Sequence, residues 1–177
     1  QLKTINAETT GAITLNTTNV ALSGDSADIV LAFTGTVTEH TGAITVTNND
    51  YTVAQLKTIN AETTGAITLS QTGVALSGDS TDIAAAFAGS VTTHTGTVAI
   101  TNNDYTLTEL VTINNASTGA ITLATTNVAL SGSSTNLAAA LDGTINSTGA
   151  VTVTNNDYTV AQLKTINAGT SGAITLN

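Results

Sequence analysis

Apolar and polar residues alternate along this chain in runs of four, and such runs recur from one end to the other. In the first run, Ile13 and Leu15 fall on one face of an extended segment, while Ala12 and Thr14 fall on the other. This alternation predicts a short β-strand with one buried face. Copies or close variants of the run predict seven strands, at 12–15, 43–46, 66–69, 97–100, 120–123, 150–153 and 173–176.

A helix start is predicted just after each of three tyrosines. Thr52 fits the N-cap of a helix and Gln55 its third residue, which is the spacing of a capping box. Tyr51 and Leu56 flank the pair as a hydrophobic staple. We therefore expect a short helix near 53–61. The same signal recurs at Thr106 with Glu109, between Tyr105 and Leu110, and at Thr159 with Gln162, between Tyr158 and Leu163.

A second kind of helix is predicted near 26–33, beginning at Asp25 or Ser26. Ile29 and Phe33 are four residues apart and share a helical face. The next copy of this segment is rich in alanine, which favours a helix over a strand. Glycines are expected to end these helices, at Gly35, Gly89 and Gly143.

The chain is built from long internal repeats. The string QLKTINAETTGAITL occupies 1–15 and returns, with variation, at 55–69, 109–123 and 162–176, at spacings of 54, 54 and 53 residues. Each unit divides into two unequal half-repeats, a helix followed by a strand. We expect residues 1–177 to form a single solenoid array of about three units. Because the chain begins and ends inside a unit, we expect it to be a fragment of a longer repetitive protein.

The predicted fold is an α/β repeat solenoid in which short helices alternate with parallel strands in one continuous sheet. Right-handed crossovers would join the strands. The layout is similar to that of leucine-rich repeats, but their L-x-x-L-x-L-x-x-N signature is absent. The outer face would carry a threonine ladder made of Thr14, Thr45, Thr68, Thr122, Thr152 and Thr175.

Two coverings of the threonine face remain open. The face could be covered by threonine and small residues alone. Alternatively, an extra segment with the sequence VALS could cover it, at Val20–Ser23, Val74–Ser77 and Val128–Ser131.

Charge narrows the range of partners. Only 8% of the residues are charged, and 3 lysines stand against 12 acidic residues, for a net charge of −9. Three lysines cannot form the basic patch that nucleic acid or an anionic lipid surface would require. No apolar run reaches the 18 residues of a membrane-spanning helix, so we expect no membrane insertion.

The Asn-Asn-Asp turns are the candidate metal ligands. Oxygen atoms of Asp50, Asp104 and Asp157 could coordinate Ca²⁺, which takes six to eight oxygen ligands. The other interpretation is a turn in which Asn and Asp bond their own backbone just before the helix cap. We favour the turn, because the glycine-aspartate nonapeptide of calcium-binding repeats is absent. No cofactor is expected.

Two further groups of polar residues have structural interpretations. Asp25 and Asp28 give way to Ser133 and Asn136 in the third unit, an exchange that a helix cap tolerates and a catalytic pair would not. We therefore assign the Asp25 segment to capping.

The histidines are assigned to an exposed loop. His40 and His94 occupy matching positions, but the third unit has Asn146-Ser147 there, so no repeated histidine site exists. No nucleophile elbow or phosphate loop occurs anywhere in the chain. We expect no catalytic residue and no enzyme activity.

The phrases TNNDYTVAQLKTINAETTGAITL and VALSGDSADIVLAF resemble repeats of giant cyanobacterial cell-surface proteins of the adhesin and motility type. The resemblance covers the whole chain. It implies secretion, an extracellular or cell-surface location and a structural role, and it carries over no catalytic residue.

These observations favour a spacer or filament segment in a large surface protein. Its expected partners are neighbouring repeats of the same parent chain, with self-association as a further option. The alternatives are a surface-binding module, in which the threonine ladder engages ice or a polysaccharide, and a Ca²⁺-binding repeat. Ala99 interrupts the ladder, and aromatic platforms for sugar are scarce, so we favour the mechanical role.

Overall fold

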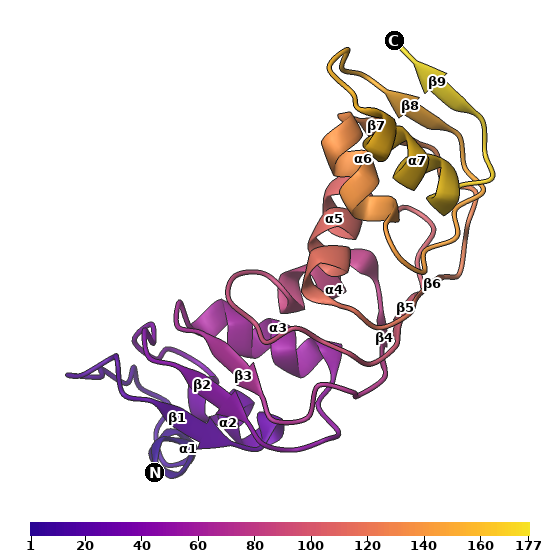
Figure 1. Ribbon diagram of the computed structural model, residues 1–177. Helices are drawn as coiled ribbons and strands as arrows, with labels where there is room; N and C mark the ends of the chain where they lie inside the picture. Colours follow the sequence, from indigo (N-terminus) through magenta and orange to yellow (C-terminus); the bar gives the residue numbers. More distant parts are fainter.

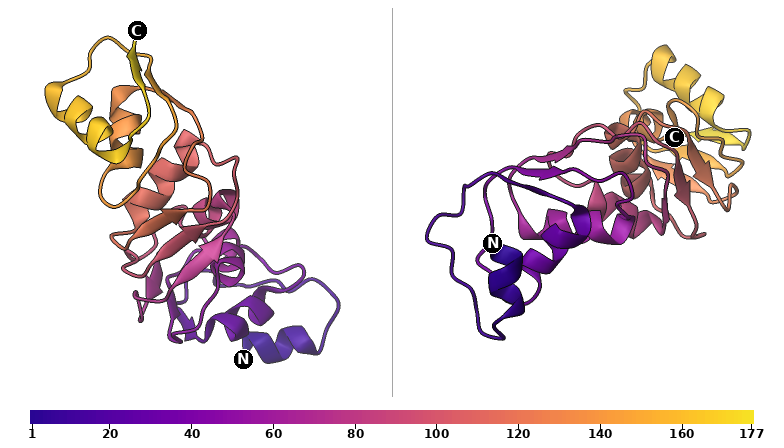
Figure 2. Two further views of the ribbon diagram at one scale, coloured as in Figure 1. Left: turned by 90° about the vertical axis from the view of Figure 1, so that its right-hand side faces the viewer. Right: turned by 90° about the horizontal axis from the view of Figure 1, so that it is seen from below.

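Seven helices and nine three-residue strands follow one another in chain order, in a computed structural model that describes residues 1–177 (Figure 1). The molecule is elongated and curved, and its termini lie toward opposite ends (Figures 1 and 2). The elements are α1 (Leu2–Ala7), β1 (Leu22–Gly24), α2 (Ser26–Phe33), β2 (Ile44–Val46), α3 (Val53–Glu62), β3 (Ile67–Leu69), β4 (Leu76–Gly78), α4 (Ser80–Ala86), β5 (Val98–Ile100), α5 (Leu107–Ala116), β6 (Ile121–Leu123), β7 (Leu130–Gly132), α6 (Ser134–Leu141), β8 (Val151–Val153), α7 (Val160–Gly169) and β9 (Ile174–Leu176).

All strand pairs are parallel, as predicted, but they do not form one continuous sheet. Three separate sheets have the orders β1-β2-β3, β4-β5-β6 and β7-β8-β9. The ladder stops after β3 because the segment that meets it, around Val91, touches it through a single bridge at Ile67. Ile67 N donates to Ser90 O at 2.7 Å, and Thr92 N donates to Ile67 O at 2.9 Å. The prediction of a continuous sheet was therefore wrong.

The VALS segments supply the first strand of each sheet. Leu22 N donates to Ala43 O at 2.9 Å, and Thr47 N donates to Gly24 O at 3.0 Å, which aligns β1 with β2. The equivalent strands β4 and β7 pair with β5 and β8 in the same way. Each unit thus has three strands instead of two, and this segment extends the sheet without covering its threonine face.

The strand predicted at 12–15 does not form. Its later copies β3, β6 and β9 each pair with the strand before them in the chain, β2, β5 and β8. Residues 12–15 have no such strand before them, and only Ile13 forms a bridge, with Val37. The other six predicted strands are present, each beginning one residue later than expected.

The capping boxes are confirmed at all three predicted helix starts. Thr52 Oγ1 accepts from Gln55 N at 3.3 Å, and Gln55 Oε1 accepts from Thr52 N at 2.9 Å. Matching pairs cap α5 and α7. By contrast, α1 starts at Leu2, without a cap, and is only six residues long. Gly35, Gly89 and Gly143 follow the other helices with positive φ values of 86°, 72° and 79°, so they end those helices as expected.

The core runs the whole length of the molecule. Ile44 and Val46 of β2, and Ile67 and Leu69 of β3, are buried against the helices, while Thr45 and Thr68 point the other way. All buried apolar side chains but one belong to a single cluster that passes through the three units. No helix has the length and hydropathy that crossing a bilayer requires.

Candidate functional site

The most regular polar feature is a cluster of three side chains. It joins the loop after β2 to the N-terminus of α2, the helix that precedes this loop in the chain. Asn48 Oδ1 accepts from Ser26 N at 2.8 Å, and Asn48 Nδ2 donates to Ser26 Oγ at 2.9 Å. Ser26 Oγ donates in turn to Gln55 Oε1 at 3.0 Å. Because Ser26 is fully buried, these bonds satisfy groups that water cannot reach. We call Ser26, Asn48 and Gln55 the joint cluster.

The joint cluster occurs once in every unit. Ser80 and Ser134 are also fully buried and accept the same bonds from Asn102 and Asn155. Their hydroxyls donate to Glu109 at 2.9 Å and to Gln162 at 3.1 Å. In the sequence, Asn48 looked like a turn residue. Its role became visible only when the fold brought it beside Ser26.

In the second unit, Glu109 takes the place of Gln55 in the joint cluster and so gives the cluster a charge. Its two carboxylate oxygens accept from Ser80 Oγ at 2.9 Å, from Thr106 N at 2.8 Å and from Thr81 Oγ1 at 2.7 Å. Burial by itself raises the pKa of the Glu109 carboxyl. The hydrogen bonds from Thr81, Thr106 and Ser80 outweigh it and hold the pKa below its ordinary value.

In each Asn-Asn-Asp turn, one carboxylate oxygen of the aspartate already accepts a hydrogen bond from the first asparagine of the same turn. Asp50 Oδ1 accepts from Asn48 Nδ2 at 2.6 Å, and Asp104 Oδ1 accepts from Asn102 Nδ2 at 2.7 Å. Asp157 accepts the same bond from Asn155. No group of three or more His, Asp or Glu side chains is placed to hold a metal ion. The geometry is that of a turn stabilised by its own side chains.

The expected capping role of Asp25 is wrong in its detail. Asp25 stands at the N-cap of α2, yet its side chain makes no capping bond and instead accepts from Thr47 Oγ1 at 3.1 Å. Asn48 accepts the N–H of Ser26, the first residue of the helix, and the equivalent bond from Ser134 to Asn155 forms in the third unit beside the Ser133 cap, so the two bonds are independent. Among the N-caps of α2, α4 and α6, only Ser133 caps with its own side chain, accepting from Asn136 N at 3.3 Å.

The helices α1, α3 and α5 each contact the next helix through side-chain interactions, which are ion pairs or hydrogen bonds from asparagine side chains. Lys57 Nζ lies 2.5 Å from Asp82 Oδ1, and Lys3 pairs with Asp28 in the same way. In the third unit both partners change together, to Val111 and Asn136. An asparagine one turn further along donates to a backbone carbonyl of the next helix in each case: Asn6 to Leu31 O at 2.8 Å, Asn60 to Ala85 O at 2.7 Å and Asn114 to Ala139 O at 2.7 Å.

The histidines are buried, which contradicts their assignment to an exposed loop. Their rings pack against phenylalanines, His40 on Phe33 and His94 on Phe87, with ring centroids 5.7 and 5.4 Å apart. Nε2 of His94 donates to Val74 O at 2.8 Å, which fixes the proton on that nitrogen. In the third unit Ser147 takes the histidine's place in the backbone pairing.

His94 carries the one buried polar side-chain atom without a hydrogen-bond partner, its Nδ1. In the first unit, His40 Nδ1 lies 3.4 Å from Thr63 Oγ1. Burial lowers the pKa of His94 below its ordinary value of 6.5, and the bond to the Val74 carbonyl only partly opposes this. The imidazole is therefore held neutral as a packing element.

The threonine ladder is split into shorter rows. Thr45 pairs with Thr68, and Thr152 pairs with Thr175, but Thr122 has Ala99 beside it. Thr14 lies outside all three sheets because the 12–15 strand is missing. Serines of the VALS segments extend the rows at their other end: Ser23, Ser77 and Ser131. These side chains are exposed or half-exposed, and the face has no cover.

The fold is α/β, with three small parallel sheets alternating with helices, and the polar clusters recur at equivalent positions of the sequence. In comparisons with known proteins, the chain matches no family model, no curated protein and no solved structure.

Proposed function

We propose that the chain is a non-catalytic structural segment: an α/β solenoid array of about three 54-residue units that acts as a spacer or filament in a larger extracellular surface protein. The observation that carries the proposal is the joint cluster, repeated in each unit at buried serines. Its polar groups are occupied in holding turns together. The extracellular location rests on the sequence resemblance to cyanobacterial surface repeats.

The range of the contacts supports a mechanical role. No side-chain hydrogen bond joins residues more than 29 positions apart, the longest being Ser26 to Gln55 and Ser80 to Glu109. Neighbouring half-repeats also meet directly, through the bridges Ile13–Val37 and Ile67–Val91. At the equivalent place in the third unit, Ile121 N donates to Thr144 Oγ1 at 3.2 Å. An array held by such neighbour contacts has a stability that is a sum of unit and interface terms.

Pulling the chain between two handles tests this role. Unfolding is expected in steps, each releasing one 54-residue unit, or about 190 Å of contour at roughly 3.5 Å per residue. Thr106→Ala removes the cap of α5 in the central unit and should lower the force of one step only. Thr108→Ala, on the same helix but without a side-chain hydrogen bond, is the matched control. A single rupture of the whole chain would contradict the proposal.

A surface-binding role is the second candidate, because the threonine face is uncovered and its hydroxyls make no side-chain hydrogen bonds within the protein. Thr45 and Thr68 form its best-aligned pair. Thr45→Lys combined with Thr68→Lys should abolish retention on ice or on an insoluble polysaccharide if this role is correct. Lys substitution of Thr17, an exposed residue outside the sheets, is the control. Absence of retention for the unaltered chain would reject the role.

A further inference from the structure

His94 holds the segment in front of β4 against the rest of the second unit. Its Nε2 donates to Val74 O at 2.8 Å, its backbone N–H donates to Ala116 O, and its carbonyl accepts from Thr118 N. The ring is fully buried and packs on Phe87. His94 therefore contacts three parts of the chain at once: α4, the segment that leads into β4, and the turn after α5.

A second proton on this ring does not fit its surroundings. Because the Nε2–H is already bonded to the Val74 carbonyl, the proton has to go to Nδ1, which has no hydrogen-bond partner. A charged N–H that is buried without an acceptor is unfavourable, whereas outside the core both nitrogens would bond to water. Acid therefore favours a state in which the ring has left the core. The lowered pKa of His94 agrees with this geometry.

No charged group on the elements that touch His94 is bonded to its ring. The segment 70–78 and the turn 117–120 contain no charged residue. The carboxylates on the other neighbouring elements are bonded elsewhere: Asp79 to Thr101, Asp82 to Lys57, and Glu109 to Ser80, Thr81 and Thr106. A protonated ring would therefore gain no ion pair in its closed position.

The equivalent ring in the first unit has a partner for its second nitrogen. His40 Nε2 makes the same contact, with Val20 O at 2.8 Å, but its Nδ1 lies 3.4 Å from Thr63 Oγ1. In the second unit Ser117 stands at the position of this threonine, and His94 Nδ1 is left without a contact of this kind. A proton on Nδ1 thus has an acceptor in the first unit only.

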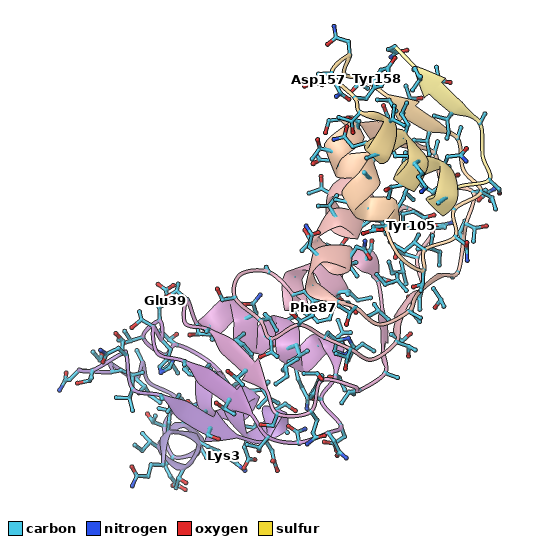
Figure 3. All side chains as sticks on the ribbon, viewed as in Figure 1. Lys3, Glu39, Phe87, Tyr105, Asp157 and Tyr158 are labelled. Carbon is cyan, nitrogen blue, oxygen red and sulfur yellow. The ribbon has the colours of Figure 1, made fainter.

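Two carboxylates also distinguish the first unit. Glu39 precedes His40 and is exposed at the surface (Figure 3), and the backbone N–H of His40 donates to the carbonyl of Glu62 at 3.1 Å. The second unit has Thr93 and Ala116 at these two positions. Negative charge near a histidine favours its protonated form. We therefore expect the first unit to tolerate a protonated ring better than the second.

The third unit has no ring to protonate. Ser147 stands at the histidine position and donates to Thr126 O at 3.3 Å, and Leu141 replaces the phenylalanine. Three units of nearly the same fold thus differ at one buried position: a histidine with an acceptor, a histidine without one, and a serine.

We infer that the second unit is a pH-sensitive switch: in mild acid the ring of His94 leaves the core and the segment 72–78, with β4, opens, while the first and third units stay closed. Leu76 of β4 is 3% exposed in the closed state and would then contact water. In the proposed spacer, acid would loosen one unit and leave the units on either side of it folded.

Hydrogen exchange at single amides tests the switch. Protection factors at about pH 7.5 and about pH 5 are compared, because they correct for the intrinsic pH dependence of exchange. Equivalent amides are hydrogen-bonded in every unit: Leu22, Thr41 and Gly42 in the first, Leu76, Thr95 and Gly96 in the second, and Leu130, Thr148 and Gly149 in the third. Protection in the second unit should fall several-fold, and by at most about 30-fold, the limit that an ordinary pKa of 6.5 for the opened His94 ring sets at about pH 5. In the first and third units it should change by less than about twofold. A fall of the same size in all three units overturns the switch.

Reciprocal substitutions test the three positions that distinguish the two histidines. Thr93→Glu, Ala116→Glu and Ser117→Thr together give His94 the surroundings of His40 and should reduce the acid-induced loss of protection in the second unit. The reverse set, Glu39→Thr, Glu62→Ala and Thr63→Ser, should create such a loss in the first unit. Protection at about pH 7.5 shows whether each variant is folded. No response of either unit to its set overturns the inference.

His94→Gln removes the titrating group and keeps a donor for the Val74 carbonyl. The acid-induced loss of protection in the second unit should disappear in this variant, and its persistence overturns the switch. A chain that unfolds in unit-sized steps, but whose second unit does not respond to acid, overturns the switch alone and leaves the proposed function standing.

Discussion

The side chain of Asn48 caps a helix that begins at Ser26, 22 residues earlier in the chain. Its Oδ1 accepts the N–H of the first residue of the helix at 2.8 Å, while the side chain of the adjacent Asp25 makes no capping bond. Helix capping is usually a local matter between residues two or three positions apart. Here the bond connects residues of neighbouring half-repeats. It therefore both caps the N-terminus of α2 and holds two half-repeats together.

Asn48→Ala should therefore lower the free energy of unfolding by about 1 to 3 kcal/mol, because it leaves the buried Ser26 N–H without a partner and removes one of the two bonds to the Ser26 hydroxyl. Asn49→Ala, at the exposed neighbouring position of the same turn, should change it by less than about 0.5 kcal/mol. Chemical denaturation of the two variants measures the difference. Equal effects would show that the joint cluster contributes nothing beyond the turn.

Gly65→Ala should be strongly destabilising, and Gly11→Ala should not, although both glycines open the same sequence motif. A Cβ on Gly65 would collide with the carbonyl of Gly42, whereas at Gly11 the nearest atom is Thr9 Oγ1 at 3.4 Å. The backbone at Gly65 must shift, at a cost of about 1 to 3 kcal/mol or more. Thermal melting of both variants checks this. A tolerated Gly65→Ala would contradict the close backbone approach between turns.

Stability should fall in mild acid because of His94. Its pKa is lower in the folded chain than its ordinary 6.5, so the unfolded chain binds the proton first. The contribution is complete above about pH 6.5 and is lost as the pH falls below that value. His94→Gln, which keeps a donor for the Val74 carbonyl, should flatten the dependence of unfolding free energy on pH between about 7 and 5. An unchanged slope in that variant would exclude His94 as its source.

Glu109 should make the free energy of unfolding depend on pH in a second, more acidic range. Its pKa is lowered from 4.5 in the fold, so it stabilises the chain above about pH 4.5, and this contribution disappears as the pH falls through the folded pKa. Glu109→Gln matches the residue at the equivalent positions 55 and 162 and should remove this dependence. Urea titrations at neutral pH and near pH 3 provide the comparison. A variant that tracks the unaltered chain at both values would argue against it.

Calcium should leave the melting temperature unchanged. Each Asn-Asn-Asp turn already uses one aspartate oxygen for its own asparagine, as in Asp50 with Asn48. A ligand that binds only the folded state would raise its stability by RT ln(1 + [L]/Kd). Melting in EDTA and in excess Ca²⁺ should therefore coincide, and a clear upward shift with Ca²⁺ would reinstate Asp50, Asp104 and Asp157 as ligands.

The sequence predicted the local features well because they depend on neighbouring residues. The capping box at Thr52 and Gln55 involves residues three positions apart, and α3 begins at Val53 as expected. Six of the seven strands follow from alternation within four residues. The strand at 12–15 failed for a non-local reason: Ile13 has only the Val37 bridge, with no strand before it in the chain.

The features that the sequence did not predict all depend on which segments, distant in the sequence, lie side by side in the fold. His40 and His94 are polar residues next to a turn, which favoured exposure, yet stacking places them on Phe33 and Phe87. A signal was present in the third unit, where Phe and His are replaced together by Leu141 and Ser147. The joint loss of Lys57 and Asp82 equivalents was a similar signal.

The constant offset between bonded residues also bears on how the array can change in length. Lys3 reaches Asp28 and Lys57 reaches Asp82 across the same 25 positions, and Asn6, Asn60 and Asn114 each span 25 as well. Recombination between near-identical stretches of the gene that inserts or deletes one whole period therefore keeps the asparagine donors in register with backbone carbonyls 25 positions further along. A one-residue deletion in a loop is also tolerated, since Ser134 in the shorter third unit still donates to Gln162 across 28 positions instead of 29. A change in length by whole periods therefore preserves the register of these bonds.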